Sequence, residues 1–281
     1  MRNLFVFLSI LALQSARATA FSDLKYLLSS GKLEIRAIST GAYQEDCLQF
    51  FITNKSGGPI HLLLQAGMQF NSMNDSEQDL ILTSNTDKIL APGAKLVCMG
   101  KAYCFQASRR CPSIGGKYTL FDKQDTSLNR VATFLAKRAF ARQINQNAIW
   151  TVSDHHSIAA IPDTSEALQS LRVLLSHLSN QVIPWYRTDY AHVRTAGGGI
   201  DMVPLQLSTT ITFSLPQLNY ITVQLLDEQG RSAGFILQHW QQPGTNINYP
   251  ISINTKNLSR GKYSLVLSTD KETLFRKELE V

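Results

Sequence analysis

The sequence predicts a mainly β protein, with an N-terminal β-sandwich that carries appended helices, then a linker, then a C-terminal Ig-like β-sandwich. The first observation is that hydrophobic residues recur at every second position in segments of residues 33–105 and again of residues 205–281, which is the period of a half-buried strand. The second is that the period changes to three and four over residues 127–178, which is typical of amphipathic helices. Two β-rich bodies with helices between them follow from this order.

Composition narrows the class of protein. Of the 281 residues, 44% are hydrophobic and 17% are charged, which excludes a disordered chain. The single apolar run, at the start of the sequence, is too short to span a bilayer, so a multi-span membrane protein is excluded. Four cysteines are too few for a scaffold built mainly on disulfides.

Residues 1–20 have the three parts of a secretory signal peptide. Arg2 supplies the positive charge, residues 4–13 form the apolar segment, and Ala18-Thr19-Ala20 matches a small-x-small cleavage site. We therefore expect a mature chain that begins at Phe21 and has no transmembrane span. We expect it to pass through the periplasm and to be secreted or held on the outer cell surface.

The expected passenger domain covers residues 21–183. Hydrophobic alternation on both sides of a Gly-containing loop at residues 54–58 predicts a hairpin. One helix is expected over residues 127–142, and a short helix or strand over residues 147–153, whose Trp150 fills the core. Another helix begins near Glu166. Residues 184–204 contain two prolines and three consecutive glycines, which predict a linker.

Residues 205–281 predict the second sandwich, because short strands follow each other with turns and no helix between them. A strand ends in the turn Asp227-Glu228-Gln229-Gly230-Arg231, and Leu258-Ser259-Arg260-Gly261-Lys262-Tyr263 leads into another strand. These motifs, with the basic and apolar final strand, resemble the C-terminal sorting domain of proteins exported by the bacterial type IX secretion system. The Pro-Asn-Pro motif of that family is replaced by Phe213-Ser214-Leu215-Pro216. The resemblance implies contact with the secretion machinery, and it implies no activity.

The cysteines are candidates for disulfides in an oxidising compartment. Four cysteines allow three pairings, and the sequence leaves the choice open. We favour Cys47 with Cys98, on neighbouring strands, and a local loop closed by Cys104 and Cys111. A structural zinc site is disfavoured because no Cys-x-x-Cys spacing occurs.

Positive charge is concentrated between Lys95 and Arg142, where ten basic residues face two acidic ones. Four of the basic residues are expected on the outer side of one helix, as an anion-binding patch: Arg130, Lys137, Arg138 and Arg142. For a secreted protein the expected partner is an anionic surface polysaccharide. No nucleic acid is expected, because aromatic residues are not interleaved with the basic ones. The alternative is a solvated helix face without a partner.

No enzyme is predicted. The Gly-x-Ser-x-Gly, Walker, Gly-x-Gly-x-x-Gly and His-Glu-x-x-His motifs are absent, and we expect no cofactor and no metal. Asp154-His155-His156 is the densest polar cluster, but adjacent histidines do not face one site on a helix, so a surface loop is expected. The other histidines are scattered singly, without ligand spacing: His61, His177, His192 and His239.

A second resemblance lies in the passenger. Tyr103-Cys104-Phe105 and, later, Asn145-Gln146-Asn147-Ala148-Ile149-Trp150 resemble the two motifs of bacterial thioester adhesin domains. The resemblance implies an internal thioester between Cys104 and Gln146, which captures amines on a target surface. Asn145 stands where that family has Thr, and the two motifs are close together for the family. The alternative is Cys104 in a disulfide and Gln146 as a helix cap.

Three functions remain at this point. The first is a non-enzymatic secreted or cell-surface protein with a type IX-like sorting domain, whose passenger binds an anionic surface or polysaccharide. The second is a covalent thioester adhesin that uses Cys104 and Gln146. The third is an unrecognised secreted hydrolase, which only the predicted export supports.

Overall fold

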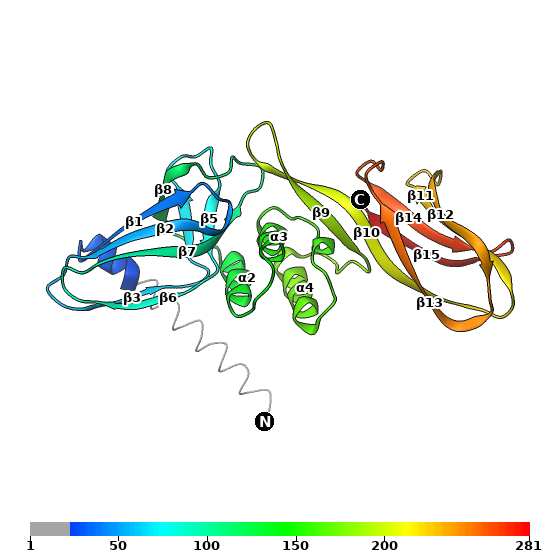
Figure 1. The fold of residues 1–281 in the computed structure, drawn as a ribbon, viewed down its shortest axis with the longest axis horizontal. Helices are drawn as coiled ribbons and strands as arrows, with labels where there is room; N and C mark the ends of the chain where they lie inside the picture. Colours follow the sequence, from blue (N-terminus) through cyan, green and yellow to red (C-terminus); the bar gives the residue numbers. More distant parts are fainter. Residues whose placement is uncertain (1–22) are drawn as a thin grey trace, which may run out of the picture. The chain divides into compact units, whose positions relative to one another are not determined.

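The computed structural model describes residues 23–281, so the predicted signal peptide at residues 1–20 lies outside the described residues. The described chain forms two compact units (Figure 1). The barrel unit contains the chain up to Asp154 together with Ala196–Gly199, and the sandwich unit contains His155–Thr195 and Ile200–Val281. Both units are built mainly from β-strands, which confirms the predicted fold class.

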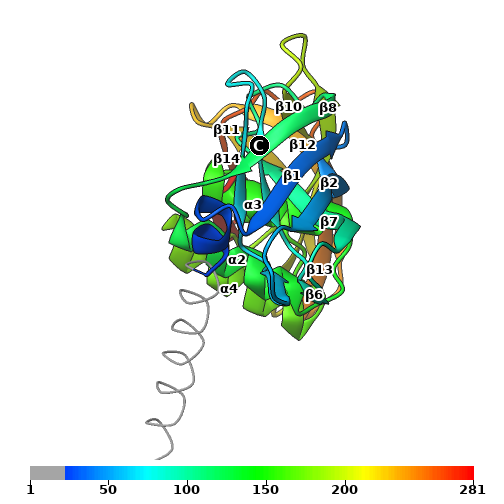
Figure 2. The same ribbon diagram turned by 90° about the vertical axis from the view of Figure 1, so that its left-hand side faces the viewer.

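Six antiparallel strands close into a barrel in the first unit, so the strands predicted as a sandwich form one continuous ring of hydrogen bonds. In barrel order the strands are β1 (Leu33–Thr40), β2 (Gln44–Asn54), β7 (Lys95–Phe105), β5 (Asp79–Leu82), β4 (Gln69–Ser72) and β8 (Ile114–Leu120). Figure 2 shows β1, β2 and β7 side by side. The remaining strands, β3 (Ile60–Leu64) and β6 (Thr86–Leu90), pair as a two-stranded sheet.

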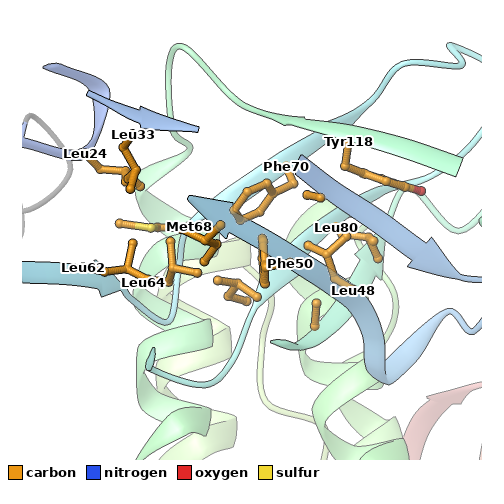
Figure 3. Close-up of a cluster of buried hydrophobic side chains, with 14 of the residues drawn as sticks. Leu24, Leu33, Leu48, Phe50, Leu62, Leu64, Met68, Phe70, Leu80 and Tyr118 are labelled. Carbon is orange, nitrogen blue, oxygen red and sulfur yellow. The ribbon is translucent and has the colours of Figure 1, made fainter. Parts of the chain in front are cut away.

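The barrel interior is filled by alternate residues of its strands (Figure 3). Leu48, Phe50 and Ile52 on β2 are all buried, and the rings of Phe50 and Phe70 lie 5.3 Å apart. Leu24, from the helical residues 23–29, adds a side chain to the same core. Because each of these side chains leaves water on folding, burial contributes roughly 1.5–3 kcal/mol per large apolar residue.

The helix predicted over residues 127–142 is two helices. The first, α2, spans Thr126–Ala136 and is capped by Asp125, whose side chain accepts from the amides of Ser127 and Leu128. The second, α3, spans Arg142–Ser153. The chain leaves the helical path between them, where Phe140 stacks on Phe134 with ring centroids 6.4 Å apart. The helical alternative for residues 147–153 is confirmed, and Trp150 is fully buried.

The sandwich unit pairs a three-stranded sheet with a four-stranded sheet, as predicted for its C-terminal part. The first sheet contains β13 (Gly244–Asn254), β10 (Ile200–Leu215) and β9 (Arg187–Arg194), and the second contains β12 (Ser232–Gln241), β11 (Asn219–Asp227), β14 (Lys262–Ser268) and β15 (Thr273–Glu280). Aliphatic side chains from both sheets, such as Ile211, Ile221 and Leu265, are fully buried between them. The unit also contains a short 3₁₀ helix (Ile158–Ala160) and α4 (Glu166–Ser179), which Ser165 caps.

The predicted linker at residues 184–204 is wrong. Strands β9 and β10 pair across this segment from Ile200↔Arg194 onward, and the glycines form the turn between the strands. Pro204 is accommodated at a bulge, where the register shifts between Pro204 and Gln206. The division between the two units falls instead after Asp154, at the end of α3. Across residues 23–281, no helix is both long and apolar enough to cross a membrane.

Candidate functional site

Cys104 and Gln146, the two residues of the thioester resemblance, are in contact. Cys104 lies at the end of β7 and Gln146 in the second turn of α3. Nε2 of Gln146 donates a hydrogen bond of 2.7 Å to the backbone carbonyl of Cys104, across a separation of 42 positions. Both residues are fully buried. The structure therefore brings the two motifs together inside the barrel unit.

Residues next to Cys104 and Gln146 also connect β7 to α3. The amide of Cys104 donates to the carbonyl of Tyr43 at 3.0 Å, and the Tyr43 ring stacks on Trp150, with centroids 6.2 Å apart. One residue before each member of the pair, Nδ2 of Asn145 donates to the Tyr103 hydroxyl at 3.1 Å. Tyr103 and Trp150, two aromatic residues of the motifs, thus connect α3 to β7 and to Tyr43. The third, Phe105, packs near Phe121 instead, with ring centroids 6.0 Å apart.

Asp154 connects the far end of α3 to the chain that leaves β7. Its carboxylate accepts hydrogen bonds from the backbone amides of Gln106 at 3.1 Å and Ala107 at 2.9 Å. Ser153 Oγ donates to the same carboxylate at 2.6 Å. The C-terminal end of α3 is therefore fixed to the chain that follows β7, in addition to the contact at Gln146. Asp154, which the sequence predicts in a surface loop, therefore has a structural role at the end of α3.

Burial dominates the electrostatics of this region. It raises the pKa of the Cys104 thiol well above its usual range, and the charges of Cys47, Cys111 and Asp79 act in the same direction. Burial also raises the pKa of Tyr103 to about 12, although the hydrogen bond from Asn145 opposes this. The Cys104 thiol is consequently protonated at neutral pH, and little water reaches it.

The carboxamide of Gln146 is only half satisfied. Its nitrogen donates to Cys104, whereas its Oε1 is buried and accepts no hydrogen bond from any described residue. A buried carbonyl oxygen without a donor costs roughly 1–3 kcal/mol, so the fold retains it against a penalty. The Gln146 carboxamide is bonded to the backbone of a buried cysteine, so both side chains that an internal thioester requires lie in the same dry interior.

The predicted disulfides are wrong, since none of the four cysteines, all of which lie within residues 23–281, forms a disulfide. Cys98 lies opposite Phe50 in the β2–β7 register. Cys47 lies farther along β2, beside a bulge, and its thiol donates to the Ala102 carbonyl at 3.2 Å. Cys104 is fully buried, whereas Cys111 is half-buried and its amide is bonded to the carbonyl of Gly198. Cys104 is therefore not occupied by a disulfide.

The four basic residues of the expected anion-binding patch are all exposed, but they do not share one helix. Arg130 lies on α2, Lys137 is the C-cap of α2, Arg138 follows it, and Arg142 begins α3. Arg138 lies over the Phe134 ring, 3.6 Å from its centroid, and donates to the Phe134 carbonyl. The prediction of one common helix side is wrong, because the helix ends at Ala136.

Sequence spacing did not reveal a group in the sandwich unit. His156 Nδ1 lies 2.8 Å from the sulfur of Met202, and Met202 is directly opposite His192 in the β9–β10 register. Burial and the neighbouring His156 lower the pKa of His192 to about 4. Among residues 23–281, no three His, Cys, Asp or Glu side chains gather as a metal site, and a thioether falls outside that set.

The two motifs of the sorting-domain resemblance meet at one end of a sheet. Strands β11 and β14 pair with Asp227 opposite Tyr263. Asp227 accepts from the amides of Gln229 and Arg231, and Nε of Arg231 donates to it at 2.8 Å. Residues from both motifs line a shallow cavity of about 280 Å³. No family model matches the chain, and no curated protein matches it.

Proposed function

We propose that this protein is a covalent surface adhesin whose barrel unit holds an internal thioester between Cys104 and Gln146. The observation that carries the proposal is the 2.7 Å hydrogen bond between the Gln146 carboxamide and the Cys104 carbonyl, with both residues fully buried. The lack of a disulfide at Cys104 supports it as well, because a disulfide there would exclude the bond. No catalytic residue or cofactor is part of this proposal.

The bond forms by condensation within the chain. Cys104 Sγ attacks Cδ of Gln146, the carbon–sulfur bond forms, the carbon–nitrogen bond breaks, and the nitrogen leaves as ammonia with the thiol proton. The raised pKa of Cys104 makes the free thiol a weak nucleophile. Holding the two residues together in the core compensates for this, since intramolecular reactions reach effective molarities of about 10⁵–10⁸ M when the reacting groups are well oriented.

The thioester then acts once, on a primary amine of the target surface. The amine nitrogen attacks Cδ of residue 146, an amide forms, the carbon–sulfur bond breaks and the Cys104 thiol is regenerated. Burial serves this function, because a dry interior protects an activated acyl group from hydrolysis until an amine reaches it. The exposed basic residues of the barrel unit support a preceding noncovalent contact with an anionic surface.

Methylamine labelling of the purified full chain tests this function. We expect one methylamine on residue 146 and one new titratable thiol per chain, both located by peptide mass spectrometry. Gln146→Glu keeps the side-chain shape but removes the ammonia leaving group, and Cys104→Ala removes the nucleophile, so both variants should take up no methylamine. Cys47→Ala is the matched control, because Cys47 is an equally buried free thiol of the same barrel.

Two results would overturn the proposal. One is a wild-type protein that takes up no methylamine, both when native and in partly unfolding urea. The other is uptake that persists in Gln146→Glu. Because Cys104→Ala leaves a cavity in the core, circular dichroism of each variant establishes that it is folded before labelling.

A second proposal concerns export by way of the sandwich unit. The meeting of the Asp227–Arg231 turn with Tyr263 at one end of the β11–β14 pair supports a type IX-like sorting role. Deletion of residues 205–281 should retain the passenger in the periplasm, and Arg231→Gln, which loses the ion pair to Asp227, should reduce export of a folded chain. Full export of the deletion variant to the medium would make the module structural.

A further inference from the structure

Three side chains of the sandwich unit, from three separate segments, meet beside a cavity. Nδ1 of His156, in the loop before the 3₁₀ helix, lies 2.8 Å from Sδ of Met202 on β10. Met202 is directly opposite His192 on β9. Directly opposed residues of an antiparallel pair have Cβ atoms about 4.5–5.5 Å apart and share one sheet face. Two imidazoles and a thioether are therefore within reach of one common point.

We propose that His156, His192 and Met202 bind a soft monovalent cation, Cu(I), through two imidazole nitrogens and one thioether sulfur. Thioether sulfur selects soft cations, and imidazole suits copper, whereas magnesium and calcium require oxygen ligands. This site lies in the sandwich unit and does not depend on the thioester proposed for the barrel unit.

The geometry requires only a small adjustment to admit an ion. With metal–nitrogen and metal–sulfur bonds of about 2.0 and 2.3 Å, His156 Nδ1 and Met202 Sδ can lie at most about 4.3 Å apart when both bind the ion. They now lie 2.8 Å apart, so the sulfur has to move away by no more than about 1.5 Å. Met202 is unbranched and has three rotatable side-chain bonds, so its sulfur can make this movement without backbone change. His156 and His192 are held on the loop and on β9, which sets the position of the ion.

Charge around the site favours a monovalent ion over a divalent one. The three ligands are neutral when bound, so the ion keeps its whole charge in a half-buried place, and the desolvation cost grows steeply with that charge. Among the acidic residues that line the cavity beside the ligands, Asp201 and Glu280, the carboxylate of Asp201 is paired with Arg260 at 2.8 Å. Arg260 also donates to the Met202 backbone carbonyl at 3.1 Å. The charge of Asp201 is therefore already compensated by Arg260.

Solvent reaches the ligands through a cavity of about 400 Å³. His156 and Met202 line it, together with Tyr190 and Gln181, while His192 is half-buried. Gln181 Nε2 donates to the His156 carbonyl at 3.1 Å, which holds the loop that carries this ligand. An ion can thus enter from the cavity and meet a thioether and an imidazole on arrival.

Nuclear magnetic resonance with Ag(I), the redox-inert analogue of Cu(I), tests the site on the full chain with ¹³C-methyl methionine. The cysteine thiols will also bind silver, so a signal that belongs to the site itself is required. We expect the Met202 methyl resonance to shift and saturate with one Ag(I) beyond that taken by the thiols. The exposed methionines Met73 and Met99 serve as internal controls that should not follow it.

Variants separate a built site from chance binding. His192→Gln and, independently, His156→Gln should weaken the Ag(I) response at Met202 by at least about tenfold, the loss that removal of even an outer-sphere partner produces. His239→Gln, a histidine of the same unit that contacts Gln241 and Tyr249 instead, is the matched control and should leave the response unchanged. A Met202 methyl that moves no more than that of Met73, or that responds in either ligand variant as strongly as in the wild type, would overturn the proposal.

Discussion

The two units differ in what they bury. Most of the buried polar side chains of residues 23–281 lie in the barrel unit, among them Gln78, Asp79, Gln146 and Asn147. The sandwich unit buries fewer, Arg172, Ser179, Thr188 and Thr255, and the cluster between its two sheets consists mainly of aliphatic and aromatic side chains. A buried polar group costs free energy unless it is hydrogen-bonded, so a core that keeps several of them holds a specific arrangement, whereas an apolar core only stabilises.

The comparison assigns different consequences to mutation in the two cores. The largest effect is expected for Leu265→Ala in the sandwich unit, where the side chain is fully buried. Loss of its methyl groups and the cavity left behind should lower the free energy of unfolding by about 2–5 kcal/mol. Hydrogen exchange, read peptide by peptide, should show faster exchange in the sandwich unit, while methylamine uptake in the barrel unit stays at the wild-type level. A parallel fall in uptake would mean that the two cores do not act separately.

A smaller effect is expected at the end of α3. Asp154→Ala removes the acceptor for the amides of Gln106 and Ala107, and leaving such donors unsatisfied costs roughly 1–3 kcal/mol. Urea denaturation should show this loss, and the yield of thioester should fall because α3 is freed at one end. Asp122→Asn is the control, since its side chain is 94% exposed and should change neither measurement. An unchanged thioester yield in Asp154→Ala would show that Asp154 does not position α3 for thioester formation.

The two units should respond to pH with opposite sign in the carboxylate range. Burial raises the pKa of Asp79 in the barrel unit, so the native unit binds this proton more tightly than the unfolded chain and loses stability as pH rises through the folded pKa. For Asp227 in the sandwich unit, slight burial is outweighed by hydrogen bonds and the charge of Arg231, which lower its pKa. That contribution is lost as pH falls through the lowered pKa. Denaturation from pH 3 to 6, with Asp79→Asn and Asp227→Asn as matched variants, measures each contribution. If the pH dependence of stability is the same in Asp79→Asn as in the wild type, Asp79 does not cause the loss of stability with rising pH.

The smallest stability effects are expected on the basic surface of the barrel unit. Arg130→Gln should change the free energy of unfolding by within about 0.5 kcal/mol, whereas Arg138→Gln also loses a cation–π contact of about 0.5–1 kcal/mol. The fourfold variant of Arg130, Lys137, Arg138 and Arg142 should weaken binding to an anionic polysaccharide such as heparin, and added salt should do the same to the wild type. If neither the fourfold variant nor added salt weakens binding, the four basic residues form a solvated surface without an anionic partner.

Local sequence patterns predicted most helices and strands, but they could not predict features that depend on contacts between residues far apart in the sequence. The alternation on β2 and the start of α4 at Glu166 could be predicted because strand and helix periods are local properties. The break between α2 and α3 was missed because no Gly or Pro marks it and the stacking of Phe140 on Phe134 is tertiary. The linker prediction failed for a related reason, since glycines that suggest a boundary also form hairpin turns.

The candidate site was predictable only through its motifs. Composition and spacing alone could not bring Cys104 and Gln146 together, because their contact depends on how α3 lies against β7. The group of His156, His192 and Met202 was missed entirely, since its members come from a loop and two strands and a methionine carries no ligand spacing. The disulfide prediction failed because export suggests oxidation, whereas the register decides which cysteines face each other.

The central claim, that Cys104 and Gln146 share a covalent bond, is tested most directly by the intact mass of the untreated native protein. The thioester predicts a mass lower than that of the sequence by one ammonia, and Cys104→Ala and Gln146→Glu should each restore the full sequence mass of the variant. Cys47→Ala should keep the deficit. A wild-type mass that includes the ammonia would contradict the account, and the Cys104–Gln146 contact would then be an ordinary hydrogen bond in the core.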